Sequence, residues 1–152
     1  MIMTTHLTHP TDLLELPGKT IGTTEWYPIT QDRVNRFADA TDDHQWIHTD
    51  PERAAAGPFG GTIAHGYLTL SLAPKILAEV LEVDNVTAAL NYGLNKVRFP
   101  SPVPVGAKMR ATVTVTSAQQ KPAGIEVVFG LTYETEGTAR PACIADVVVL
   151  YR

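Results

Sequence analysis

The chain has 152 residues, of which 44% are hydrophobic and 18% charged, a balance typical of one globular domain rather than of a disordered segment. Its net charge is −4 and its Lys and Arg residues are scattered, which excludes the concentrated positive surface that nucleic-acid binding needs. Met1 to Pro10 lacks the charged-then-apolar layout of a secretory signal. We therefore expect a cytoplasmic protein with no nucleic-acid or membrane partner.

The first quarter of the chain predicts one strand followed by one helix. Thr20–Ile29 alternates weakly between apolar and polar residues and is a candidate first strand. Thr30 is a candidate N-cap, because its hydroxyl can accept a hydrogen bond from a free N–H in the first turn of a helix. Apolar residues then recur at helical spacing over Gln31–Ala40. Thr41–Thr49 has no clear period, and we expect a loop there.

Two further helices are predicted before the midpoint. Asp50 offers a second N-cap, followed by Pro51 at the first helical position, and Gly57 ends the run of alanines. Ile63–Val83 is apolar on nearly every side. Polar residues interrupt this stretch, so we predict a central helix wrapped by a sheet and not a membrane span. Pro74 should kink that helix or open one of its turns.

The second half of the chain predicts strands. Runs rich in Val, Thr, Ile and Tyr are separated by Pro/Gly loops, and they cover Thr87–Phe99, Ala107–Ala118, Ile125–Thr135 and Ala139–Tyr151. Four consecutive strands with short connections favour an antiparallel meander, curled around the central helix in an α+β architecture. The lone Cys143 lies in an apolar run, which favours a buried core residue over a disulfide or a zinc ligand.

The densest group of titratable residues lies in the loop after the first helix and at the start of the central helix. An Asp and a His in one loop can hold a water between them and perform general acid–base catalysis. Gly66 adds a backbone N–H that a ligand carbonyl can approach closely. The residues concerned are Asp42, Asp43, His44, His48 and Asp50, with Gly60-Gly61 and His65-Gly66 further on.

Each of these residues also has a structural interpretation. Asp50 caps the helix already described, and Asp43 by itself can cap a turn. His44 and His48 are four residues apart and could share a metal if the loop were helical, but the apolar residues between them favour packing. His65 can bury its ring or bind the backbone. Spacing alone leaves the catalytic and the structural interpretations both open.

A family resemblance bears on this choice. The stretch Phe37–Asp50 has an Asp (Asp43), a His five residues on (His48) and a second Asp two beyond, and Ile63-Ala64-His65-Gly66 follows. These offsets resemble the hydratase-2 motif of the MaoC-like (R)-specific enoyl-CoA hydratases. Asn91–Pro100 resembles the strand after the helix in the same family. Nearly the whole chain is similar to the short single-domain mycobacterial members, which share the His-Gln-Trp-Ile-His wording.

The resemblance implies a hotdog fold over residues 1–152, a curled antiparallel sheet wrapped around a long central helix, in a homodimer. It implies a hydro-lyase of fatty-acid metabolism that adds water reversibly and syn to a trans-2-enoyl-CoA to give a (3R)-3-hydroxyacyl-CoA. No metal or other cofactor is implied, because the CoA thioester is the substrate. Two alternatives remain open: a hotdog acyl-CoA thioesterase and a non-catalytic acyl-thioester-binding subunit.

The resemblance also assigns roles to residues. Asp43 and His48 match the catalytic pair, and Gly66 matches the residue whose backbone N–H polarises the thioester carbonyl. The substrate-binding candidates are Gln45, Ile63, His65, Tyr67, Asn91, Gly93, Lys96 and Arg98. For the CoA phosphates the candidates are Lys96, Arg98, Lys75 and Arg53, each of which could equally be a solvated surface residue.

The chain departs from the family pattern in two places. Gln45-Trp46 stands where many members have Asn-Pro, and Pro74 stands where some carry a serine, with Ser71 one turn earlier. Both departures put the detailed support of the Asp43 carboxylate in doubt.

Overall fold

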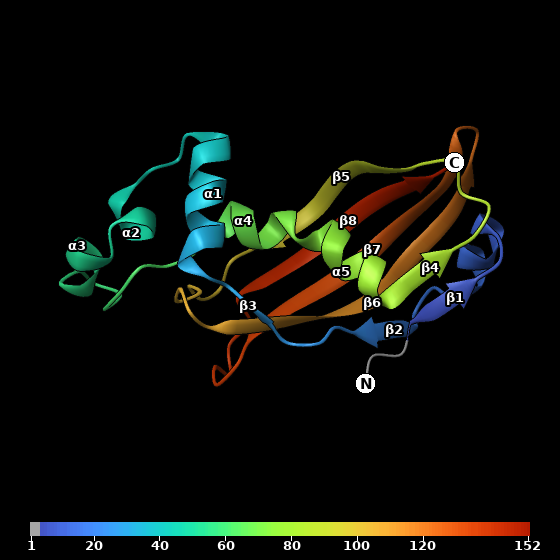
Figure 1. The fold of residues 1–152 in the computed structure, drawn as a ribbon. Coiled ribbons are helices and arrows are strands. Elements are labelled where there is room, and N and C mark those ends of the chain that lie inside the picture. The colour runs from blue at the N-terminus through green and yellow to red at the C-terminus, as the bar shows by residue number, and fades with distance from the viewer. Residues whose placement is uncertain (1–3) are drawn as a thin grey trace.

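A curved six-stranded sheet forms one side of the molecule in the computed structural model, which describes residues 4–152 (Figure 1). Its neighbours run in the order β2-β6-β7-β8-β5, with β3 also paired to β6, and all these pairings are antiparallel. The strands are β2 (Thr20–Thr23), β3 (Tyr27–Pro28), β5 (Ala89–Arg98), β6 (Lys108–Lys121), β7 (Gly124–Thr135) and β8 (Cys143–Tyr151).

The predicted meander is confirmed for β6, β7 and β8 but is wrong for β5. That strand pairs with β8 at one edge of the sheet, so after β5 the chain passes across β8 and β7 before it starts β6. Local pattern identifies a strand but not its neighbour, which long-range packing decides. The predicted first strand, Thr20–Ile29, is likewise divided into β2 and β3, both of which pair with β6.

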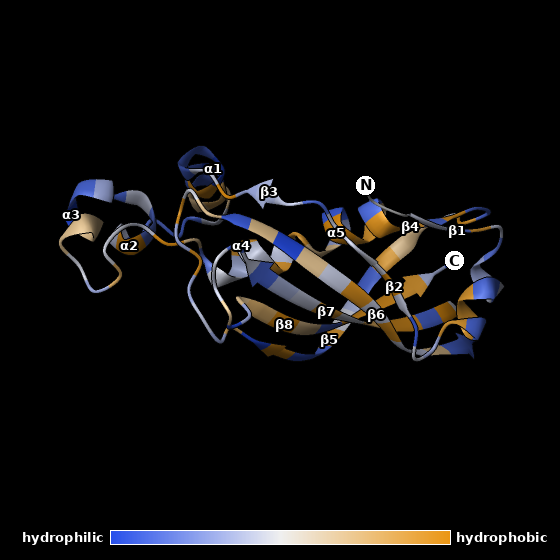
Figure 2. Cartoon of the chain, turned by 90° about the horizontal axis from the view of Figure 1, so that it is seen from below, coloured by the Kyte–Doolittle hydropathy of each residue, from blue (hydrophilic) through white to orange (hydrophobic). Residues whose placement is uncertain are grey.

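Alternation in β6 places its apolar residues in the core. Met109, Ala111, Val113 and Val115 are fully buried, whereas the residues between them are partly exposed. They join a hydrophobic cluster with β7, β8 and the central helix, which includes the fully buried Phe129 and Ile76. Figure 2 shows hydrophobic and hydrophilic residues interleaved along these strands. Cys143 is buried in this cluster, as predicted, and burial raises the pKa of its thiol to about 12.

The central helix is shorter than predicted and has two parts. It consists of α4 (Gly66–Ser71) and α5 (Ala73–Val80), with Pro74 in the first turn of α5, where its missing N–H breaks no helical hydrogen bond. The predicted end of the helix, Leu81–Val83, is instead strand β4, which pairs in parallel with β1 (Thr5–Leu7).

The sheet covers only one side of this central helix. The covered side carries buried residues such as Leu68, Ile76 and Val80. The opposite side carries an exposed stripe at helical spacing, formed by Tyr67, Ser71, Pro74 and Ala78. The expectation of a helix apolar and enclosed all round is therefore corrected, because this stripe lies outside the core.

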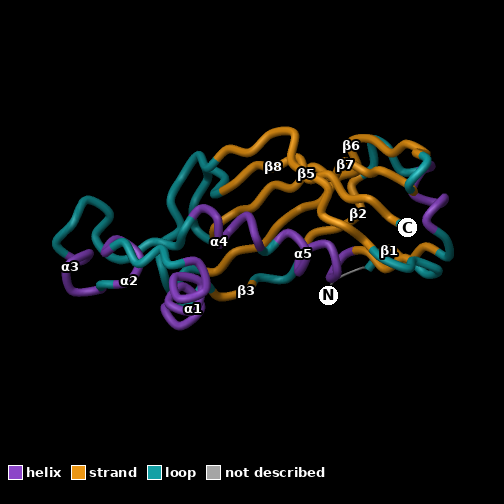
Figure 3. The backbone as a smooth tube through the Cα atoms, turned by 90° about the horizontal axis from the view of Figure 1, so that it is seen from above, coloured by secondary structure: helices purple, strands orange, loops and turns teal. Residues whose placement is uncertain are grey.

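The remaining helices lie at one end of the molecule. They are α1 (Gln31–Thr41), α2 (Trp46–Thr49) and α3 (Pro51–Ala55), and α2 and α3 extend beyond the sheet (Figures 1 and 3). The predicted caps are confirmed, since Thr30 accepts from the Arg33 N–H and Asp50 from the Arg53 N–H. The predicted loop Thr41–Thr49 contains the short helix α2 at its end.

A short 3-10 helix, η1 (Pro10–Glu15), follows β1. Of the helices in residues 4–152, none is long and apolar enough to cross a membrane.

Candidate active site

His48 lies in α2 with its ring buried and its tautomer set by the backbone. The side chain is 7% exposed, and Nδ1 lies 2.7 Å from the carbonyl oxygen of Ile63. A carbonyl oxygen can only accept, so Nδ1 carries the hydrogen. The neutral ring then has its lone pair on Nε2, the form in which an imidazole acts as a general base.

Three hydrogen bonds hold the backbone around His48 in place, and one of them reaches His48 itself. The Ile63 N–H donates to the carbonyl of Ile47 at 3.0 Å, so this short stretch runs beside α2. From α1, Gln31 donates its side-chain amide to the carbonyl of His48 at 2.8 Å and accepts from the Thr62 hydroxyl at 2.7 Å. The sequence gives no signal for Gln31, which looks like an ordinary polar residue in the first turn of a helix.

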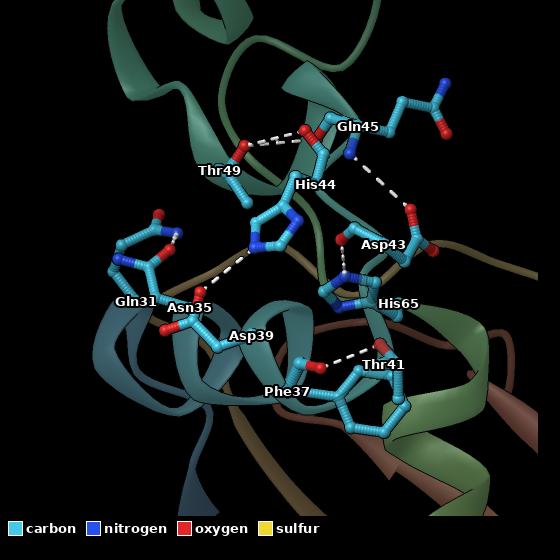
Figure 4. A network of polar contacts seen from close by, with 10 residues as sticks. All are labelled: Gln31, Asn35, Phe37, Asp39, Thr41, Asp43, His44, Gln45, Thr49 and His65. Carbon is cyan, nitrogen blue, oxygen red and sulfur yellow. Dashed lines mark hydrogen bonds and ion pairs between the residues drawn. The ribbon is translucent and has the colours of Figure 1, made fainter.

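His65, the residue before α4, contacts both members of the predicted pair. Its Nε2 donates to the carbonyl oxygen of Asp43 at 3.0 Å (Figure 4). Its ring stacks on that of His48 with centroids 3.9 Å apart, and the ring centroid of Phe37 lies 4.9 Å from that of His65. Only 2% of His65 is exposed, and this burial lowers the pKa of the imidazole, so the ring is neutral at neutral pH.

Asp43 brings an exposed carboxylate to the same place. One of its oxygens accepts from the Gln45 N–H at 3.5 Å (Figure 4). One carboxylate oxygen of Asp43 and one ring nitrogen each of His48 and His65 lie within 4.8 Å of one another. A water with two hydrogen bonds of about 2.8 Å at a tetrahedral angle spans about 4.6 Å. Asp43 and His48 are therefore spaced to share one water.

The same three residue types could in principle bind a metal ion. However, the rings of His48 and His65 are stacked with only 24° between their planes. Imidazole lone pairs lie in the ring plane, so two nearly parallel rings do not direct them at one point. His44, the residue that the other metal hypothesis paired with His48, is exposed, bonds Asp39 at 3.0 Å (Figure 4) and is not part of this cluster.

Gly66 follows His65 and is the first residue of α4. Its N–H is one of those at the start of a helix that have no helical carbonyl to bind. A Cβ added here would lie 3.3 Å from ring atoms of Phe99, which is closer than ordinary contact. Gly66 is thus adjacent in sequence to His65, which contacts both Asp43 and His48, and it packs against Phe99, a residue that the sequence alone did not single out.

Two cavities follow the exposed stripe of the central helix, between it and β5. The first, about 330 Å³, is lined by residues that include Ser71, Pro74, Asn91 and Gly93. The second, about 250 Å³, shares Pro74 and Asn91 with the first and continues to Ala78. Asp43 and His48 line neither cavity. The predicted catalytic residues thus lie near the start of the central helix, where His65 contacts both, and the apolar cavities lie along its later turns.

The predicted substrate-binding residues separate into three groups. Gln45 and Ile63 bond the predicted catalytic pair through their backbones, as His65 does through its ring. Asn91 and Gly93 line the first cavity, and Tyr67 is 73% exposed on the stripe that leads to it. Lys96 and Arg98 are exposed on β5 and line neither cavity.

The other two candidates for the CoA phosphates have local partners. Lys75 bonds Glu79 at 3.3 Å and lies over the ring of Tyr27. Arg53 lies over the ring of Trp46, with 4.4 Å between the guanidinium carbon and the ring centroid. The bulky Trp46 therefore packs within the α2–α3 segment.

Comparison with known proteins identifies the family. A family model described as a MaoC like domain matches residues 12–136. The chain belongs to the MaoC-like dehydratase family. The prediction of a hydro-lyase is confirmed at this level.

Curated MaoC-like relatives match over most of their length. The chain is 52% identical over 141 residues to the 3-hydroxyacyl-thioester dehydratase Z of Mycobacterium tuberculosis (strain ATCC 25618 / H37Rv), covering 92% of this chain and 93% of that protein. It is 41% identical to nodulation protein N of Rhizobium leguminosarum bv. viciae, covering 93% and 92%. Among solved structures, an (R)-hydratase from A. caviae superposes with a TM-score of 0.72 at 23% identity, covering 88% and 97%. The predicted hotdog fold is confirmed by this likeness and by the antiparallel sheet around a central helix.

Proposed function

We propose that this MaoC-like dehydratase is an (R)-specific enoyl-CoA hydratase, which adds water reversibly to a trans-2-enoyl-CoA and forms a (3R)-3-hydroxyacyl-CoA. The observation that carries the proposal is the pairing of Asp43 with a His48 whose Nδ1 bonds a carbonyl. The Nδ1 bond leaves the lone pair of a neutral His48 on Nε2, and one ring nitrogen of His48 lies within 4.8 Å of a carboxylate oxygen of Asp43.

In the proposed reaction, Asp43 and His48 hold the attacking water between them. Its oxygen forms a bond to C3 as the C2–C3 double bond breaks, and its proton passes to one of the two residues. A proton is delivered to C2 on the same face, which completes a syn addition. The Gly66 N–H donates to the thioester oxygen as it gains negative charge, a contribution typically of about 3–4 kcal/mol.

The cavities supply a place for the acyl chain. An apolar chain that reacts beside Gly66 would extend past Ser71 into the first cavity and, if long enough, past Pro74 and Asn91 into the second. The CoA phosphates need positive charge at the entrance, and Lys96 and Arg98 on β5 are exposed and offer it. The chemistry needs only proton transfers and an oxyanion donor, so we propose that no metal or other cofactor takes part.

We also propose a homodimer, in which β5 forms the interface. Among the described residues β5 pairs only with β8, so its other edge presents free backbone groups. Leu90, Tyr92 and Leu94 on this strand are 42%, 65% and 47% exposed. An edge strand with exposed apolar side chains is a typical site of association. A single working domain over residues 1–152 and a cytoplasmic location remain predictions, and cell fractionation would test the second.

The decisive experiment follows the hydration of crotonyl-CoA by Asp43→Asn and His48→Gln, measured as loss of the absorbance of the conjugated thioester. We expect each variant to lose at least about 100-fold in kcat, because each removes a proton-transfer group. Asp39→Asn and His44→Gln are matched controls, since they make the same chemical changes in an exposed pair of the same region. They should keep the activity of the unaltered protein.

Three results would contradict the proposal. Folded Asp43 and His48 variants that turn over at the unaltered rate would remove the catalytic assignment. Release of free thiol in place of hydration would indicate a thioesterase, which directs water at C1. Binding of the acyl thioester without any turnover by the pure protein would indicate a non-catalytic subunit.

A further inference from the structure

We propose that His65 is a positioning residue that holds Asp43 and His48 relative to each other. This differs from the substrate-binding role that the family resemblance suggested for it. The inference deepens the proposed hydratase function and rests on it. Its starting point is burial: with 2% of its surface exposed, the His65 side chain is covered by protein on nearly every side.

The two contacts of His65 reach both members of the pair. Asp43 lies just after the C-cap of α1, in the joint between α1 and α2, and its side chain has only a long 3.5 Å bond from Gln45. Its backbone carbonyl, in contrast, accepts a 3.0 Å hydrogen bond from His65 Nε2. The same imidazole stacks on His48 at 3.9 Å. One rigid ring, at the start of α4, thus sets the separation between carboxylate and base.

The choice of residue also indicates a role beyond packing. His65 Nδ1 is buried without a hydrogen-bond partner in the described structure, and a buried unpaired polar atom costs stability. A phenyl ring would fill the same space without that cost, but it could not donate to Asp43. Residues that break a local rule in this way occur mainly at functional sites.

The charge state of His65 suits this role. Burial lowers the pKa of the ring, and the groups that face it are the Asp43 carbonyl, His48, His44 and the ring of Phe37. A neutral His65 keeps Nε2 as a donor to Asp43. It also presents an uncharged aromatic face to His48, so that His48 can gain a proton during the reaction without a second cation stacked against it.

Three substitutions separate the two contacts. His65→Phe keeps a ring that can stack but loses the donor, His65→Gln keeps a donor but loses the ring, and His65→Leu loses both. We expect kcat for crotonyl-CoA hydration to fall about tenfold for the first two and about 100-fold for Leu, with KM changed by no more than about twofold. Thr69→Val is the control, a near-isosteric change at another buried polar position of α4.

The test depends on how large each loss of activity is and on whether it appears in kcat or in KM. A graded loss in kcat, with Phe and Gln each partly rescuing Leu and Thr69→Val unaffected, supports the positioning role. Unchanged kcat in all three variants, an effect confined to KM, or an equal loss in all three overturns it. If Leu fails to fold, Phe and Gln still give the test. If instead Asp43→Asn and His48→Gln keep full turnover, the proposed function itself fails, whatever the His65 variants do.

Discussion

Two regions of the molecule hold their side chains in different ways. Near the start of α4, the histidine side chains of the candidate site bond backbone carbonyls. Along α5, the cavities lie between the central helix and an exposed edge strand. His48 bonds the Ile63 carbonyl and His65 bonds the Asp43 carbonyl. In the cavities, Asn91 and Gly93 belong to β5, which is exposed over nearly its whole length. The proposed catalytic groups are thus held in place by backbone hydrogen bonds, while the cavities depend on an edge strand that association could change.

The same contrast appears between two histidines four residues apart. His48 is buried and bonded to backbone, while His44 is exposed and bonds the carboxylate of Asp39. That hydrogen bond raises the pKa of His44 above its ordinary value. A proton-transfer residue needs a fixed position and a defined tautomer, which the environment of His48 provides and that of His44 does not.

Substitutions near the start of α4 should reduce activity most. Gly66→Ala adds a Cβ 3.3 Å from the ring of Phe99, which forces a shift beside the N–H proposed to bind the thioester oxygen. We expect kcat/KM for crotonyl-CoA to fall about 100-fold, the size of effect seen when one oxyanion donor is lost. Gly61→Ala is the control, because a Cβ there meets nothing within 4 Å. Equal activity of the two variants would contradict the role of Gly66.

Substitutions that fill the cavities should affect long substrates and not short ones. Ala78→Phe places a large side chain in the second cavity of about 250 Å³. We expect turnover of long-chain enoyl-CoA to fall about tenfold while crotonyl-CoA is unaffected, because only long chains pass Pro74. A series of substrates of increasing length measures the effect, with Ala40→Phe on the exposed part of α1 as control. A uniform loss at every length would show that the acyl chain does not follow α5.

The proposed interface on β5 can be tested by measuring the molecular mass of the protein in solution. The double variant Tyr92→Lys and Leu94→Lys puts two charges on the exposed apolar edge, and like charges at a twofold interface repel. We expect the mass in light scattering to halve towards the 16.5 kDa of one chain. Asn95→Lys adds the same charge at a polar position of β5 and should leave the dimer intact. A monomeric unaltered protein would exclude the homodimer.

The smallest predicted effect is the pH dependence of stability. Burial holds the pKa of folded His65 below its ordinary 6.5, so as pH falls below 6.5 the unfolded chain gains this proton first and the free energy of unfolding drops. His65→Phe lacks this loss, and urea denaturation at pH 7.5 and 5.0 should show it. His44→Gln should behave oppositely, since the raised pKa of His44 stabilises the fold below pH 6.5 and the gain disappears as pH rises.

Local chemistry was enough to predict much of the fold. The hydroxyl of Thr30 and the carboxylate of Asp50 cap helices because a cap needs only a donor two or three residues away. Pro74 interrupts the central helix for an equally local reason, and alternation in β6 predicts its buried face. The pair Asp43 and His48 was predicted from the resemblance of its spacing to a family motif, because spacing alone left its role open, and the structure brings both residues to one cluster.

Local sequence patterns could not predict the contacts between segments that are distant along the chain. Pairing of β5 with β8 joins strands about 50 residues apart, and no local pattern names the partner. The side-chain amide of Gln31 bonds the backbone carbonyl of His48, but nothing in the local sequence pattern links these two residues. The carbonyl of Ile63 bonds the His48 ring through a backbone position that any residue type could supply. The sequence by itself, read with its family resemblance, therefore predicted the candidate catalytic residues and where many of the elements begin. Tertiary structure decided which histidine is buried, which tautomer it holds and where the cavities lie, because each depends on groups brought together only by folding.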